Sequence, residues 1–170
     1  MLVGLGILFV PPVAVAQDTA ALRMQAIREN CQSIRLLLDT LQRRDLVSRT
    51  NLGREYESMG RLFSAFKQRV QNNNLDAAAF TQLATQFTTA TNNFRSAYVR
   101  YDDSLIRLQQ INCQDSPGDF DVQLASVREQ RDATEGLSRQ AAAIAGQYRD
   151  RMADLQLSLP NEATQTTEVR

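Results

Sequence analysis

The chain has 170 residues, with nineteen basic and nineteen acidic side chains, no histidine and no tryptophan. A net charge of zero gives no long-range field to attract DNA, RNA or an anionic membrane, so the composition argues against a nucleic-acid partner. Without histidine, a Ser-His-Asp catalytic set is excluded.

Residues 1–16 have the pattern of a signal peptide for export. An uncharged, apolar stretch ends in three small residues at positions 14–16, which predicts cleavage after Ala16 and a mature chain that starts at Gln17. The stretch is shorter than the ~20 residues that span a bilayer and contains two prolines, so stable membrane insertion after cleavage is not expected. We therefore expect a secreted, periplasmic or cell-envelope protein.

Apolar residues recur at alternating spacings of three and four through the rest of the chain, which is typical of helices that pack along a heptad seam. The pattern predicts helices at about 18–71, 75–112 and 117–157. Reversals are expected at the asparagines 72–74 and at Ser116, which is the expected N-cap of the last helix. We predict an all-α fold for residues 17–157, an elongated antiparallel three-helix bundle with a spectrin-like outline, and a disordered tail at 158–170.

The two cysteines lie at nearly equal distances from the expected reversal, Cys31 forty-two residues before Asn73 and Cys113 forty residues after it. In an antiparallel helix pair this spacing places both at one level, and in an exported protein it predicts a disulfide between helices 1 and 2. A redox-active or metal-binding pair is the alternative, but the close cysteine spacing or added histidines of such sites are missing. A break near residues 50–53 would instead give four shorter helices and would lose this match.

Polar residues interrupt all three seams, and reflection through the two turns places them at neighbouring levels. The expected layer contains Asp45, Tyr101, Arg131, Ser48, Tyr98 and Thr134. One interpretation is a buried polar layer in which Arg131 pairs with Asp45, Tyr101 donates a hydrogen bond, and the group sets the register of the helices. The other interpretation is a small pocket in which a ligand carboxylate or amide replaces one of these partners.

We predict no catalytic residue, no metal site and no cofactor. The chain lacks a glycine-rich phosphate loop. Asp115, Asp119 and Asp121 cluster near a glycine, but their spacing differs from that of a calcium-binding loop, and acidic residues are common at helix N-termini. We therefore expect that the protein is not an enzyme.

The chain resembles uncharacterised exported helical proteins of the ultrasmall candidate-phyla bacteria in the segments 43–56 (RRDLVSRTNLGREY), 101–105 (YDDSL) and 112–113 (NC). The resemblance covers most of the mature chain. It implies a bacterial, surface-directed protein, and it carries no known activity and assigns no functional residue.

The first predicted helix starts before the level at which the third begins, so Leu22, Met24 and Ile27 have no obvious core to enter. Such a segment either frays after signal cleavage or docks a protein partner, including a second copy of the chain. We therefore expect a non-enzymatic structural or protein-interaction module of the bacterial cell envelope or surface. The alternatives are a periplasmic holdase or carrier-type chaperone, and a soluble component of a secretion or pilus apparatus.

Overall fold

The structure, a computed structural model, describes the backbone of residues 13–159 and the side chains of residues 19–159. Four helices follow one another in this part of the chain: α1 (Val13–Glu29), α2 (Cys31–Asn72), α3 (Ala78–Gln110) and α4 (Pro117–Ser158). No strand occurs between residues 13 and 159, so the all-α prediction is confirmed. Most of the expected signal peptide and of the expected tail lies outside the described residues.

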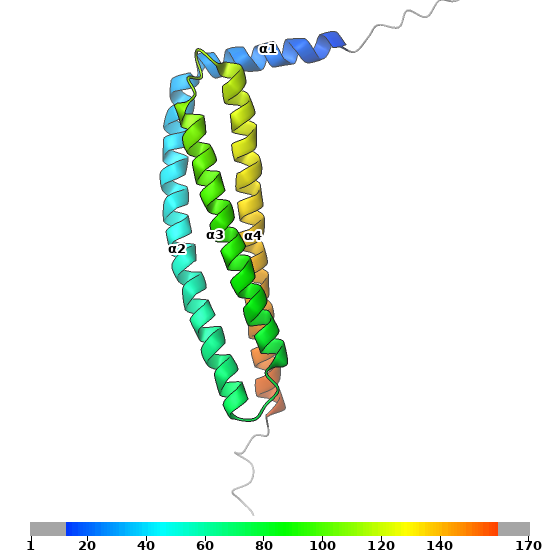
Figure 1. Cartoon of the computed structure of the whole chain (residues 1–170). Coiled ribbons are helices and arrows are strands. Elements are labelled where there is room, and N and C mark those ends of the chain that lie inside the picture. Colours follow the sequence, from blue (N-terminus) through cyan, green and yellow to red (C-terminus); the bar gives the residue numbers. More distant parts are fainter. Residues whose placement is uncertain (1–12, 160–170) are drawn as a thin grey trace, which may run out of the picture.

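The number of helices differs from the prediction. α2, α3 and α4 run side by side in alternating directions, and α1 lies crosswise over the end of the molecule where α4 begins (Figure 1). The first predicted helix, at about 18–71, is therefore two helices, and the prediction of three is wrong. The alternative break near residues 50–53 is wrong as well, because α2 continues through Gly53.

The bend between α1 and α2 is at Asn30. Its backbone N–H and its side-chain Nδ2 both donate to the carbonyl oxygen of Ala26, at 3.1 and 2.9 Å, and its own carbonyl accepts from the backbone N–H of Ile34 at 2.9 Å. Hydrogen bonding is thus kept on both sides of the bend. Sharp bends usually coincide with proline or glycine, and neither is present here, so the apolar spacing alone indicated one continuous helix.

Burial of apolar residues accounts for the direction that α1 takes after the bend. Ile27 is 7% exposed in a core cluster with Cys31 and Phe120, and Met24 packs against the same cluster. One turn before Ile27 in α1, Arg23 Nη2 lies 2.9 Å from Asp121 Oδ2 of α4. The expectation that Met24 and Ile27 have no core to enter is therefore wrong, whereas Leu22 is exposed.

Side-chain size sets the distances between the long helices. α3 packs most extensively against α4, and both helices bury small residues, among them Ala90 and Ala141. α2 stands farther from α4, with aromatic rings between them. Phe63 of α2 stacks on Tyr148 of α4 with ring centroids 3.8 Å apart, and the Tyr148 hydroxyl donates to the Phe63 carbonyl at 2.7 Å.

The chain reverses after α2 at the predicted asparagines. Asn74 has a φ of 56°, in the left-handed region that asparagine tolerates better than most residues. α3 begins at Ala78, slightly later than expected, where Asp76 Oδ1 accepts from the Ala78 N–H at 2.8 Å. Ser116 is the N-cap residue of α4, as predicted, but its hydroxyl makes no capping hydrogen bond.

A disulfide joins Cys31, the first residue of α2, to Cys113 in the loop between α3 and α4. The two Cα atoms are 5.6 Å apart, and 82 positions separate the cysteines in sequence. Cys113 is fully buried, and Cys31 is 5% exposed. The predicted pairing is confirmed, and it closes the end of the molecule on which α1 packs.

Among the four helices between residues 13 and 159, none combines the length and the apolar character that a membrane span requires.

Candidate functional site

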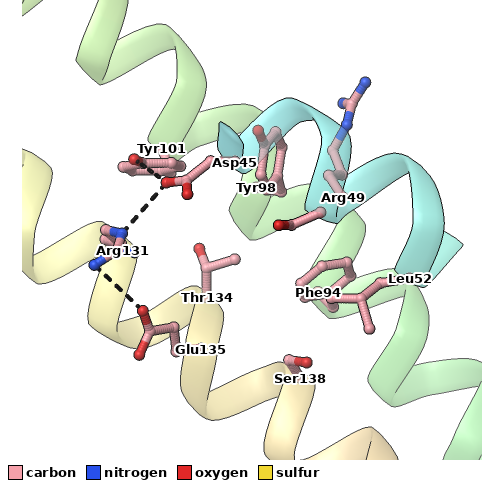
Figure 2. A pocket seen from close by; sticks show the side chains of 11 residues that line it. Asp45, Arg49, Leu52, Phe94, Tyr98, Tyr101, Arg131, Thr134, Glu135 and Ser138 are labelled. Carbon is pink, nitrogen blue, oxygen red and sulfur yellow. Dashed lines mark hydrogen bonds and ion pairs between the residues drawn. The ribbon is translucent and has the colours of Figure 1, made fainter. Parts of the chain in front are cut away.

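A cluster of polar side chains joins the three long helices part-way along their length (Figure 2). Asp45 of α2 accepts a hydrogen bond from the Tyr101 hydroxyl of α3 at 2.7 Å, on Oδ2. The same oxygen lies 3.3 Å from Nε of Arg131 on α4. One carboxylate oxygen thus receives a donor from each of the other two long helices.

The other predicted members of the polar layer differ in burial. Tyr98 and Thr134 are buried beside the cluster, and the Thr134 hydroxyl donates to the backbone carbonyl of Gln130 at 2.8 Å. Ser48 is exposed, so its assignment to a buried layer is wrong. It lies three residues after Asp45 and lines an open pocket beside the cluster.

The cluster is also less deeply buried than a core ion pair. The side chain of Asp45 is 13% exposed, and that of Arg131 is 36% exposed. Water therefore reaches the guanidinium, which reduces both the desolvation cost of the pair and the strength of its attraction.

The surroundings raise the pKa of three groups in the cluster, Tyr98, Tyr101 and Arg131. Burial raises the pKa of Tyr98 to about 12, and the Asp102 carboxylate adds to this shift. Burial also raises the pKa of Tyr101, and so does its hydrogen bond to Asp45. Burial is the largest single influence on Arg131 and opposes its charged form, but the attraction of Asp45, its hydrogen bond and the attraction of Glu135 together outweigh burial, so the pKa of the guanidinium is raised. At neutral pH the tyrosines are neutral and the arginine is a cation.

Sequence reasoning missed three contacts of this cluster. Glu135 Oε1 lies 3.5 Å from Arg131 Nη1, and the spacing of four residues on one helix is a signal that could have identified this pair. The guanidinium carbon of Arg49 lies 4.8 Å from the centre of the Tyr98 ring, a cation–π contact. The Ser138 hydroxyl lies 2.8 Å from the Tyr56 hydroxyl.

A pocket of about 210 Å³ lies among these side chains, with Leu52 and Phe94 as its apolar walls. Three of its charged groups satisfy one another, since Arg131 lies between Asp45 and Glu135 (Figure 2), and Arg49 contacts the Tyr98 ring. No histidine, free cysteine or cluster of three metal-ligating side chains occurs among the described residues. Asp45 thus links α2 to α3 through Tyr101 and to α4 through Arg131.

A larger hollow lies at the α1 end of the molecule, where it occupies about 740 Å³ between α1, α2 and α4. We call it the α1–α2–α4 groove. The apolar residues that line it are Ala26, Ile27, Ile34, Leu37, Leu38, Leu41, Leu124 and Val127. Leu38 and Val127 are buried at its floor, while Leu37 is 69% exposed on its wall. The groove exists because α2 stands apart from α4 while α1 crosses their ends.

The residues predicted to dock a partner divide between core and surface. Ile27 lines the groove and is also part of the core, so it is a fixed wall of the groove. Leu22, 65% exposed, does not line the groove. Leu37 is the large apolar side chain of the groove that is exposed, and it was not among the predicted docking residues. Its position three residues after Ile34 on the same helix is a signal that could have identified it.

Comparison of the chain with protein-family models, with curated proteins and with solved structures found no match.

Proposed function

We propose that the protein is an exported, disulfide-stabilised helical module that binds a partner protein in the cell envelope and has no enzymatic activity of its own. The observation that carries the proposal is the α1–α2–α4 groove, whose wall exposes Leu37 and whose lining is mainly apolar. Exposed apolar surface that is concave and rimmed by charged residues is typical of a protein interaction site.

Two features support export. Residues 1–16 have the pattern of a signal peptide, and a disulfide that joins two helices is typical of proteins folded in an oxidising compartment. The resemblance to exported bacterial helical proteins favours the cell envelope as the location. N-terminal sequencing of the protein from native cells should find Gln17 as the first residue. If the protein from native cells retained residues 1–16 and had free thiols at Cys31 and Cys113, export would be contradicted.

A structural role for the polar cluster supports the absence of catalysis. Asp45 is occupied by Tyr101 and Arg131, and the described cluster contains no histidine or free cysteine to act as a general base or nucleophile. The cluster therefore positions α2 against the other long helices, and through them it shapes the groove.

Site-specific crosslinking in native cells tests the interaction. A photo-crosslinking amino acid introduced at Leu37 should form an adduct with one protein species, identified by mass spectrometry and reproduced with the two purified proteins. The matched control is Leu62, which is 64% exposed on the same helix and lies outside the groove. Equal labelling from both positions, or none from Leu37, would contradict an interaction site in the groove.

The same groove favours a second candidate, a periplasmic holdase or carrier-type chaperone, because such proteins shield apolar segments of many clients. A holdase should suppress the aggregation of two unrelated unfolded proteins, and Leu37→Ser should remove this effect. A specific module should leave both aggregation reactions unchanged. Membership of a secretion or pilus apparatus is a form of the first proposal, and the identity of the crosslinked protein would distinguish it.

A further inference from the structure

The rim of the α1–α2–α4 groove is much more positive than the molecule as a whole. The net charge of the chain is zero, yet the groove is lined by four arginines and a single acidic residue, Asp121. Arg23 pairs with Asp121, and Arg131 lies between Asp45 and Glu135. The remaining two, Arg44 and Arg128, are exposed and make no ion pair with any residue between 19 and 159.

These two arginines stand on opposite walls of the groove. Arg44 belongs to α2 and Arg128 to α4, and the contact between Asp45 and Arg131 sets the register of the two helices. In this register the level of Arg44 corresponds to position 130 of α4, so Arg128 is displaced from it by about 3 Å along the axis. The positive charges therefore flank the apolar floor on both sides at nearly one level, toward the end of the groove that is farther from α1.

The long walls of the groove match a short helix in length. Its lining residues run from Ile34 to Arg44 on α2 and from Asp121 to Arg131 on α4, each about 15 Å at the rise of an α-helix. This is about three helical turns, enough to seat two or three apolar side chains at spacings of three and four.

We propose that the groove takes an amphipathic α-helix of the partner protein whose apolar stripe is flanked on both sides by Asp or Glu. This proposal rests on the proposed function and specifies the chemistry of the partner. A fatty acid carries only one carboxylate. The groove instead presents one unpaired arginine on each long wall, and this complements acidic residues on both flanks of an apolar helical stripe.

The probe is a synthetic helical peptide of about four turns, with leucines at the a and d heptad positions and glutamates at e and g. A second peptide with lysines in place of the glutamates is the matched control. Binding to the complete, disulfide-bonded protein is measured by fluorescence anisotropy. The acidic peptide should bind at least about tenfold more tightly than the basic one, and this difference should shrink as salt increases.

Variants of the groove locate the binding. Arg44→Glu, Arg128→Glu and Leu37→Ser should each weaken the acidic peptide by about tenfold, and Arg44→Gln by less, since it removes a charge without reversing it. Arg61→Glu and Leu62→Ser are matched controls on exposed positions of α2 outside the groove, and they should stay within about twofold of the unmodified protein. Far-ultraviolet circular dichroism verifies that every variant retains its helix content.

Four outcomes would overturn the acidic-helix proposal. The first two are equal binding of both peptides and equal weakening of binding by the control variants. The third is a long-chain fatty acid that binds the groove while the acidic peptide does not. The fourth is a dimer, seen in sedimentation velocity and dissociated by Arg44→Glu, while the acidic peptide fails to bind.

If the acidic peptide does not bind but Leu37 crosslinks one protein in cells, the interaction function stands and the proposed chemistry of the partner is wrong. If the peptide binds as expected and no crosslink forms at Leu37, the groove has the proposed specificity and the cellular function is wrong.

Discussion

The Tyr101 hydroxyl of α3 donates a hydrogen bond to Asp45 Oδ2 of α2 at 2.7 Å, and the two residues lie at equal distances along the chain from Asn73. Antiparallel helices of equal rise place such positions side by side. Because Arg131 of α4 approaches the same oxygen, this contact links the registers of all three long helices.

We expect Tyr101→Phe and Asp45→Asn each to lower the free energy of unfolding by about 1 to 3 kcal/mol, because the first removes a hydrogen bond to the carboxylate and the second removes the charge that strengthens it. The double variant should lose less than the sum of the single losses, with a coupling energy of about 1 to 2 kcal/mol. Denaturant unfolding measures all three. Tyr98→Phe is the control, since the Tyr98 hydroxyl makes no hydrogen bond with another described residue, and strictly additive losses would contradict the contact.

Stability should fall in alkaline solution because of the buried tyrosines. The pKa of Tyr98 is raised from 10.0 to about 12, so the unfolded chain releases this proton before the folded one does. The contribution is fully present below about pH 10 and is lost as the pH rises toward about 12. Urea unfolding across this range should show the decline, and Tyr98→Phe should make it shallower. A decline of equal steepness in that variant would assign the effect to other groups.

Removal of the disulfide should cost about 4 to 5 kcal/mol, because it releases a loop of about eighty residues in the unfolded chain. The Cys31→Ala/Cys113→Ala double variant should show this loss as a lower denaturant midpoint. A reducing agent should lower the midpoint of the native protein and leave that of the double variant unchanged. A thiol assay that finds two free thiols in the purified protein, prepared without a reducing agent, would contradict the pairing.

Ile27→Ala should destabilise the fold by about 2 to 5 kcal/mol, because it opens a cavity in the core cluster that α1 completes. Leu22→Ala, five residues earlier on the same helix and 65% exposed, should change stability by no more than about 0.5 kcal/mol. Thermal or denaturant unfolding compares the two variants. Equal and small effects would show that α1 does not pack on the core.

The spacing of residues along the chain was sufficient to predict which residues meet across the turns. Cys31 forms its disulfide with Cys113, as predicted, and the same reflection through Asn73 accounts for the contact of Phe66 with Phe80, whose ring centroids are 5.1 Å apart. Such pairings follow from the constant rise of an α-helix and from the position of the reversal, and both are local properties of the chain.

Tertiary packing decided the direction of α1 and the distance of α2 from α4. No local signal marks a bend at Asn30, and the chain bends there because Ile27 is buried against the start of α4. Heptad spacing likewise identifies which face of α2 is apolar, but the sizes of rings such as Phe63 and Tyr148 hold that helix away from α4. The groove results from these two tertiary effects, because the orientation and separation of helices depend on side chains that are distant in sequence.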